Sequence, residues 1–118
     1  MALRVVLVDD DARFRTMARR ALVAEGVDVV AEVGDGAAAV EAVATWRPDV
    51  VLVDIRMPGV DGPEVARRLR EEAGAPVVIL ISTVDIENGR RLAQGLAAGY
   101  LQKDELSLAA ILELLPAP

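Results

Sequence analysis

Three segments of the chain are almost continuously apolar and rich in β-branched residues. They are Leu3–Val8, interrupted only by Arg4, then Val50–Val53 and Val77–Ile81. Strands that are covered on both faces, as in a parallel sheet, have this pattern. The segment Val27–Val33 is interrupted by Asp28 and Glu32 and predicts an edge strand, while Gly99–Gln102 predicts a short fifth strand.

Between these segments, apolar residues recur at the i, i+3, i+4 and i+7 spacing of an amphipathic helix. The four predicted faces are Phe14, Met17, Ala18, Ala21 and Leu22; Ala37, Val40, Val43 and Ala44; Val65, Ala66, Leu69 and Ala73; and Leu108, Ile111, Leu112 and Leu115. Asp11 is expected to cap the first helix. Five such βα repeats with short loops predict an α/β fold, a doubly wound parallel sheet with helices on both faces.

The length and hydrophobicity of the chain fit one globular domain spanning residues 1–118. The chain has 118 residues and a hydrophobic content of 53%, which is enough for a single core. Residues 116–118 resemble the start of a linker. Apolar runs stop at five residues, far short of the ~20 needed to span a bilayer, and the N-terminus lacks the features of a secretory signal. We therefore expect a cytoplasmic protein without membrane contact.

The composition restricts the chemistry that the chain can perform. Cysteine and histidine are both absent, which excludes disulfides, thiolate metal sites and imidazole bases. The formal charge of −6 argues against direct binding to nucleic acid. Lys103 is the only lysine among 13 basic residues. Any reaction must therefore use carboxylates, hydroxyls and amines.

Polar residues follow four of the predicted strands at their carboxyl ends, where ligands bind in open α/β sheets. They are Asp9 and Asp10, then Asp54, then Ser82 and Thr83, and finally Lys103. Three neighbouring carboxylates repel one another unless a cation neutralises them, and oxygen ligands of this kind suit Mg²⁺. Asp10 and Asp54 would be direct ligands, Asp9 would act through water, and a backbone carbonyl shortly after Asp54 would complete the site.

Asp54 is a candidate nucleophile, because a carboxylate can attack a phosphoryl group to give an acyl phosphate. Lys103 would neutralise the incoming charge as a compact ammonium, and Ser82 or Thr83 would donate a hydroxyl hydrogen bond. Each residue also has an ordinary structural interpretation. The acidic triplet at Asp9 is equally typical of a polar turn with a helix cap. The joint placement of these residues at four strand ends favours the site.

Three stretches carry a resemblance to the receiver domains of bacterial two-component response regulators. They are Val8-Asp9-Asp10, Asp54-Ile55-Arg56-Met57-Pro58-Gly59-Val60-Asp61-Gly62, and Gly99-Tyr100-Leu101-Gln102-Lys103. The resemblance covers essentially the whole chain. It implies a CheY-like, flavodoxin-like sheet of five strands in the order 2-1-3-4-5 with five helices.

The resemblance also implies roles for individual residues. Asp54 would accept a phosphoryl group from a sensor histidine kinase, and Lys103 would contact the phosphate. Mg²⁺ would be held by Asp9, Asp10, Asp54 and the backbone carbonyl of Arg56. Tyr100 would be the aromatic residue whose rotamer reports activation. Such a domain is a signalling component rather than an enzyme with its own substrate turnover.

The end of the third stretch points to an output. Lys103-Asp104, in place of lysine-proline, is similar to receivers of the NarL and LuxR type, which are joined to DNA-binding domains in transcription regulators. A C-terminal DNA-binding domain or a downstream protein is therefore an expected partner. The last predicted helix has more leucine than one buried face needs, which leaves a homodimer or partner surface as a further expectation.

One position departs from the family pattern. The family has a serine or threonine at the end of the fourth strand, and counting back from Lys103 places Ile81 there. Ser82 is the favoured replacement over Thr83, and loss of the hydroxyl is the alternative, giving a degenerate receiver that acts by protein contact alone. A small Mg²⁺-dependent phosphatase is a third hypothesis. Arg56 disfavours it, because such enzymes need a second acid to protonate the leaving group.

Overall fold

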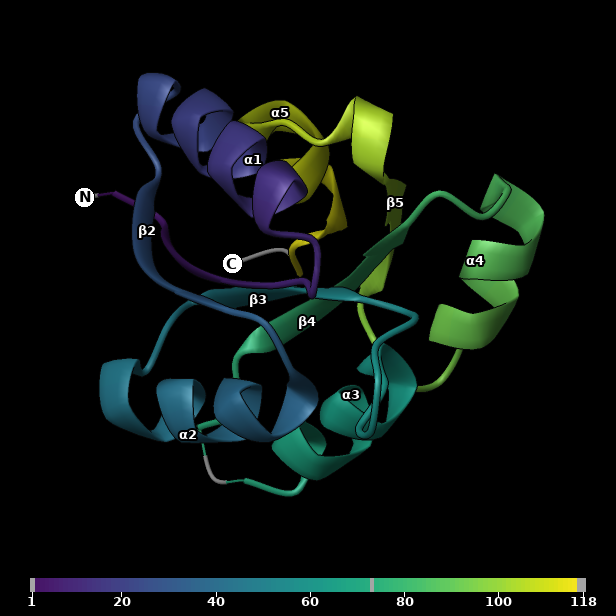
Figure 1. The fold of residues 1–118 in the computed structure, drawn as a ribbon. Helices are drawn as coiled ribbons and strands as arrows, with labels where there is room; N and C mark the ends of the chain where they lie inside the picture. Colours follow the sequence, from purple (N-terminus) through teal and green to yellow (C-terminus); the bar gives the residue numbers. More distant parts are fainter. Residues whose placement is uncertain (1, 73, 117–118) are drawn as a thin grey trace.

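The computed structural model describes residues 2–72 and 74–116, and its centre is a parallel sheet of five strands (Figure 1). The strands are β1 (Arg4–Val8), β2 (Asp28–Val33), β3 (Val50–Asp54), β4 (Val77–Ser82) and β5 (Gly99–Gln102). Their spatial order is β2-β1-β3-β4-β5. The predicted fold and the edge position of β2 are both confirmed. Ala73 and residues 117–118 lie outside the described residues.

Within the described residues, four α-helices connect the strands and a fifth follows the last strand. They are α1 (Ala12–Ala24), α2 (Gly36–Trp46), α3 (Gly62–Arg70), α4 (Ile86–Ala93) and α5 (Leu108–Leu114), and a 3₁₀ turn, η1 (Lys103–Glu105), follows β5. Each α-helix starts after a polar residue whose side chain accepts a backbone N–H: Asp11, Asp35, Asp61, Asp85 and Ser107. The predicted cap at Asp11 is confirmed.

The helices cover both faces of the sheet. On one face α1 and α5 pack against alternate strand residues, and Ala18, Leu22 and Ile111 are buried there. On the other face α2, α3 and α4 bury a second cluster that includes Val53, Leu69 and Tyr100 (Figure 1). Side chains alternate between these clusters along β1, β3 and β4, so a shift of one residue there moves a side chain to the opposite face.

Three predicted helical faces differ from the structure in detail. In α5 the predicted Leu112 is 51% exposed, whereas Ile111 beside it is buried. In α1 the side chain of Met17 is 69% exposed and Ala21 is exposed, because Phe14, Ala18 and Leu22 alone form the line that contacts the sheet. In α2 the buried alanines are Ala39 and Ala42, whereas the predicted Ala37 and Ala44 face solvent. Alanine fits either environment, so alanine-rich periodicity fixes the helix but not its rotation.

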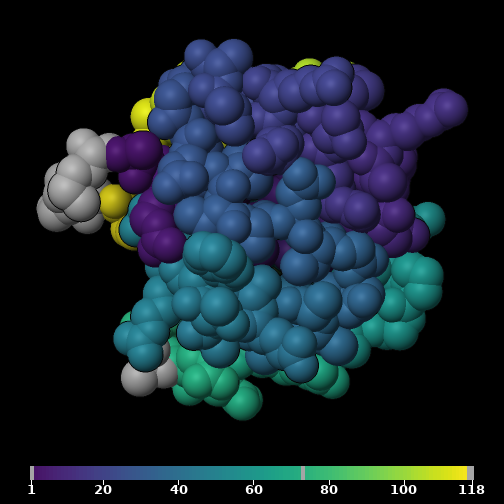
Figure 2. Space-filling view, turned by 60° about the vertical axis from the view of Figure 1, so that its left-hand side comes forward, coloured from purple at the N-terminus to yellow at the C-terminus, as the bar shows by residue number. Residues whose placement is uncertain are grey.

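The sheet edge at β2 reaches the surface. Figure 2 shows residues of α1 and α2 forming a continuous surface with those of β2 between them. Within the described ranges, 2–72 and 74–116, none of the helices is long and apolar enough to cross a membrane.

Candidate functional site

Three carboxylates meet at the carboxyl ends of β1 and β3. Carboxylate oxygens of Asp9, Asp10 and Asp54 all lie within 4.8 Å of one another. The two strands are direct neighbours in the sheet, which brings their last residues together. Asp9 is fully buried and Asp54 is 6% exposed, while Asp10 faces solvent. Buried oxygen ligands with one open side fit a hard divalent cation such as Mg²⁺.

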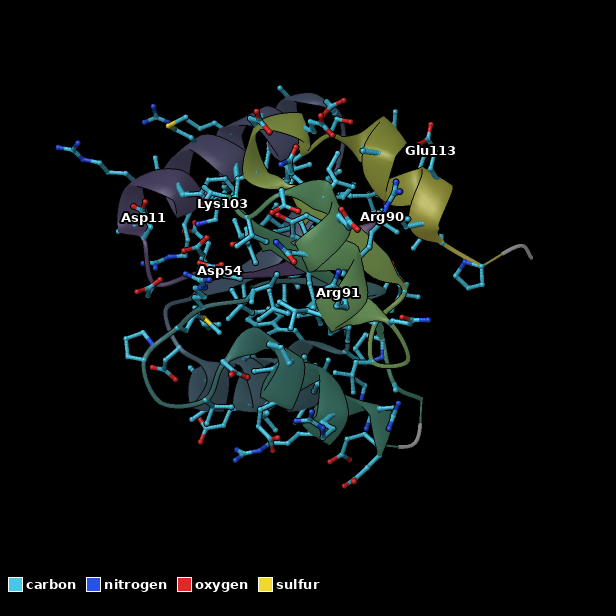
Figure 3. The ribbon with its side chains drawn as sticks, turned by 90° about the vertical axis from the view of Figure 1, so that its right-hand side faces the viewer. Asp11, Asp54, Arg90, Arg91, Lys103 and Glu113 are labelled. Carbon is cyan, nitrogen blue, oxygen red and sulfur yellow. The ribbon has the colours of Figure 1, made fainter. Side chains whose placement is uncertain are left out.

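Lys103 extends from η1 into this acidic cluster. Its Nζ lies 2.7 Å from Asp9 Oδ2 and 3.3 Å from Asp54 Oδ2, and Figure 3 shows Lys103 directly above Asp54. Burial disfavours the charged ammonium, but the hydrogen bond to Asp9 and the charge of Asp54 outweigh it, so the pKa of Lys103 is raised. The lysine therefore stays protonated and acts as a fixed positive charge.

The environment of Asp54 opposes its ionisation. Burial and the neighbouring charge of Asp9 raise the pKa of Asp54, while Lys103 and the N–H of Arg56 act in the opposite direction. That N–H donates to Asp54 Oδ1 at 3.3 Å. The net shift is upward, so an additional cation beside Asp54 would relieve unfavourable electrostatics. Together with the close approach of the three carboxylates, this electrostatic environment fits the site to a metal ion.

The loop after β3 folds back on Asp54. Gly62 N donates to the carbonyl of Ile55, and a Cβ at position 62 would overlap the carbonyl oxygen of Asp54. Only glycine therefore allows α3 to start this close to the strand end. Arg56 is exposed in this loop, two residues after Asp54, while Met57 is buried against the core. The loop is thus anchored at both ends while its middle stays open.

The end of β4 places Ile81, not Ser82, opposite Asp54. In the β3–β4 register Asp54 pairs with Ile81, and Ile81 is fully buried in the cluster under α1 and α5. Ser82 follows in the alternation, so its buried side chain faces the opposite side of the sheet. Thr83 is exposed beyond the strand. The strand therefore directs the hydroxyl of Ser82, which the sequence hypothesis favoured, away from the side of Asp54.

Tyr100 points into the protein under α4. Its ring is 6% exposed, and its hydroxyl lies 3.0 Å from the carbonyl of Ser82 and 2.5 Å from that of Val84. Burial raises the pKa of Tyr100, with a smaller contribution from the charge of Asp85. The Nε2 of Gln102 also donates to the Val84 carbonyl, at 3.2 Å. Two side chains of β5 thus hold the β4–α4 loop.

Comparison with known proteins identifies the family. The model of the response regulator receiver domain matches residues 5–115. The chain belongs to this family. The receiver is 47% identical over 105 residues to the "Probable transcriptional regulatory protein NarL" of Mycobacterium tuberculosis. The matched region covers 86% of this chain and 48% of that protein. It is 44% identical over 85 residues to the "DNA-binding response regulator MtrA" of the same organism, covering 72% of this chain and 37% of that protein.

Solved structures agree with this assignment. The receiver domain of NarL from Mycobacterium tuberculosis superimposes with a TM-score of 0.80 at 43% identity, covering 89% of this chain and 86% of that chain. The chemotaxis protein CheY4 of Vibrio cholerae shares the fold, with a TM-score of 0.84 at 23% identity over 98% of this receiver and 100% of CheY4. The receiver spans less than half the length of MtrA and of NarL.

Four contacts at this end of the sheet were not expected from the sequence. Lys103 Nζ lies 4.5 Å from the centroid of the Phe14 ring. Arg15 donates from NH1 to the carbonyl of Asp9, and its Nε lies 3.6 Å from Glu32 Oε1. Gln102 holds the β4–α4 loop as described above. Phe14 had only an apolar periodicity, Arg15 had no distinguishing feature, and Gln102 lay in a family stretch without a role of its own, so the sequence alone could not predict these contacts.

Proposed function

We propose that this receiver accepts a phosphoryl group on Asp54 from a phosphohistidine of a partner kinase, with Mg²⁺ bound beside it. The observation that carries the proposal is the triad of carboxylates, two of them buried, with a single ammonium reaching the two buried ones. Asp9, Asp10, Asp54 and the backbone carbonyl of Arg56 would hold the ion. When bound, Mg²⁺ supplies positive charge to the carboxylates and to the phosphoryl oxygens.

The transfer balances without any further reactant. An oxygen of Asp54 attacks phosphorus, the new O–P bond forms as the N–P bond of the phosphohistidine breaks, and the histidine nitrogen keeps the electron pair. Lys103 would leave its carboxylate partners and neutralise a phosphoryl oxygen. The phosphoryl group carries about 1.5 to 2 negative charges, by analogy with other phosphorylated side chains, while the carboxylate gives up its own single charge as the acyl phosphate forms. We expect the reaction to occur in the cytoplasm, in one receiver unit formed by this chain.

The partners follow from the same proposal. A sensor histidine kinase would supply the phosphoryl group. NarL and MtrA bear names of transcriptional and DNA-binding regulators, which supports a downstream DNA-binding domain or protein as the output. Leu112 on α5 is 51% exposed, which supports a partner or homodimer surface there.

A second candidate function is favoured by Ile81. Isoleucine cannot donate to a phosphoryl oxygen, and Tyr100 already lies inward with its hydroxyl on two carbonyls. We infer that phosphorylation of Asp54 would be coupled only weakly to the surface of α4 and β5. In that case the receiver would signal by contacts that its unmodified form already offers.

Incubation with Mg²⁺ and acetyl phosphate, followed by intact mass measurement, tests the phosphoryl acceptor. We expect one phosphoryl adduct on the wild type and complete loss of it in Asp54→Asn, because the amide is not a nucleophile. Asp104→Asn is the matched control, since this exposed carboxylate lies next to Lys103 outside the cluster. An unmodified wild type, or an adduct on Asp54→Asn, would refute the assignment. Continuous turnover of a chromogenic phosphoester would instead favour a phosphatase.

A further inference from the structure

We propose that Phe14 is a positioning residue for Lys103, holding its ammonium beside Asp54 during phosphoryl transfer. The inference rests on the proposed function of Asp54. The Nζ atom lies 4.5 Å from the centroid of the Phe14 ring, within the range of a cation–π interaction. The lysine side chain is only 16% exposed, and desolvation strengthens such a contact.

The position of Phe14 is fixed relative to the acidic loop. It lies in the first turn of α1, and its backbone N–H donates to Asp11 Oδ1 at 3.3 Å. Asp11 in turn donates its own N–H to Asp9 Oδ1 at 2.9 Å. The ring also packs against the buried cluster under α1 and α5. Phe14 therefore sits on the same rigid turn that carries the carboxylates.

Lys103 needs such a guide because its other partners change during the reaction. The lysine has a flexible four-carbon stem, and both anions that hold it, Asp9 and Asp54, are the proposed ligands of the metal. As these carboxylates bind a cation or a phosphoryl group, their hold on the ammonium weakens. The Phe14 ring is neutral, so it retains the ammonium without competing for the metal or the phosphoryl oxygens.

Two substitutions distinguish the effect of the aromatic face of Phe14 from the effect of its apolar volume. Phe14→Tyr keeps an aromatic face under Lys103, whereas Phe14→Met keeps an apolar side chain of similar size without one. Met17→Leu, at an exposed site one turn further along α1, is the matched control. We expect the initial rate of phosphorylation by acetyl phosphate to fall about threefold to tenfold in Phe14→Met and to stay within about twofold in Phe14→Tyr and Met17→Leu.

The composition allows a readout that a merely structural role would not change. Lys103 is the only lysine, so selective labelling of lysine gives a single side-chain signal. Phe14 is the only phenylalanine, so it is the one phenylalanine ring that could shift that signal. We expect the ε-methylene protons of Lys103 to be shifted upfield by the ring in the wild type and Phe14→Tyr, and to lose that shift in Phe14→Met. The Mg²⁺ affinity should remain unchanged in all variants.

The outcomes distinguish the role of Phe14 from the phosphoryl-acceptor role of Asp54 on which it rests. A wild type that is not phosphorylated would overturn the role of Asp54. Normal phosphorylation of the wild type together with an equal rate in Phe14→Met, or an unshifted Lys103 signal, would overturn the role of Phe14 alone. A loss of rate with an equal loss of Mg²⁺ affinity would show that Phe14 supports the loop rather than the lysine, and would also overturn it.

Discussion

The two faces of the sheet differ sharply where β4 ends. On the face of α1 and α5, Ile81 lies opposite Asp54, so an apolar side chain borders the acidic cluster. On the face of α4, Ser82, Tyr100 and Gln102 form a polar group around the β4–α4 loop. The hydroxyls of Ser82 and Tyr100 thus lie on the opposite face of the sheet from Asp54. Strand register, more than residue type, therefore decides which groups can act together.

The largest expected effect on folding comes from disturbing the packing of Gly89 in α4 against Tyr100. A Cβ at this position would overlap ring carbons of Tyr100. Gly89→Ala should therefore displace the ring or α4 and lower the free energy of unfolding by about 1 to 3 kcal/mol, despite the better helix propensity of alanine. Urea unfolding measures the loss, and Arg90→Ala on the exposed face of α4 is the control.

A double variant tests the cause. If the ring is the obstacle, Gly89→Ala combined with Tyr100→Ala should lose less stability than the sum of the two single variants. Additive losses would mean that the alanine disturbs α4 independently of Tyr100.

The role of Gly89 also shows what sequence patterns could not predict. The strands were predicted because residues such as Val50–Val53 are apolar on both faces, and the predicted fold followed from their alternation with helices. Helix α4 had no predicted apolar face, because its buried residues are only Gly89 and Ala93. Glycine contributes no hydrophobic periodicity, although its missing side chain is the reason that Tyr100 fits.

The candidate site was predictable to a similar degree. The carboxylates and Lys103 were assigned because each follows a strand, and parallel strands end at one edge of the sheet. The contact of Phe14 with Lys103 joins residues 89 positions apart in the chain, so no local pattern could reveal it. The position of the hydroxyl was ambiguous by one residue, and a single step along a strand changes the face on which a side chain lies.

A smaller effect is expected from moving a hydroxyl to the Asp54 side. Ile81→Thr buries a hydroxyl in place of apolar atoms and should lower the free energy of unfolding by about 1 to 2 kcal/mol. It should also increase the change in the Tyr100 ring signals on addition of Mg²⁺ and beryllofluoride, because a donor now lies beside Asp54. NMR of the single tyrosine measures this response.

Ser82→Ala tests whether the hydroxyl on the α4 face takes part in the same response. Its hydroxyl lies on the α4 face, so we expect the wild-type response of Tyr100 to beryllofluoride to be retained. A response abolished by Ser82→Ala would assign the hydroxyl role to Ser82 after all. No gain in Ile81→Thr would mean that a hydroxyl at position 81 does not couple Asp54 to Tyr100.

The smallest expected effect concerns the charge of Asp54 itself. Burial and Asp9 raise the pKa of Asp54, so the folded protein binds a proton there more readily than the unfolded chain. The ionised carboxylate therefore reduces stability at neutral pH, and this loss disappears as the pH falls through the folded-state pKa of Asp54. Without Mg²⁺, Asp54→Asn should melt slightly above the wild type at pH 7, and the difference should shrink on acidification.

Mg²⁺ should reverse that order, because an ion held by the three carboxylates offsets their mutual repulsion and binds only the folded state. The wild type should gain more in melting temperature than Asp54→Asn as Mg²⁺ is titrated, while Ile81→Thr should gain as much as the wild type. Thermal melts with and without Mg²⁺ at two pH values measure all three. Equal gains in the wild type and Asp54→Asn would mean that the ion binds away from Asp54. The mutual repulsion of Asp9, Asp10 and Asp54 would then not be offset by Mg²⁺.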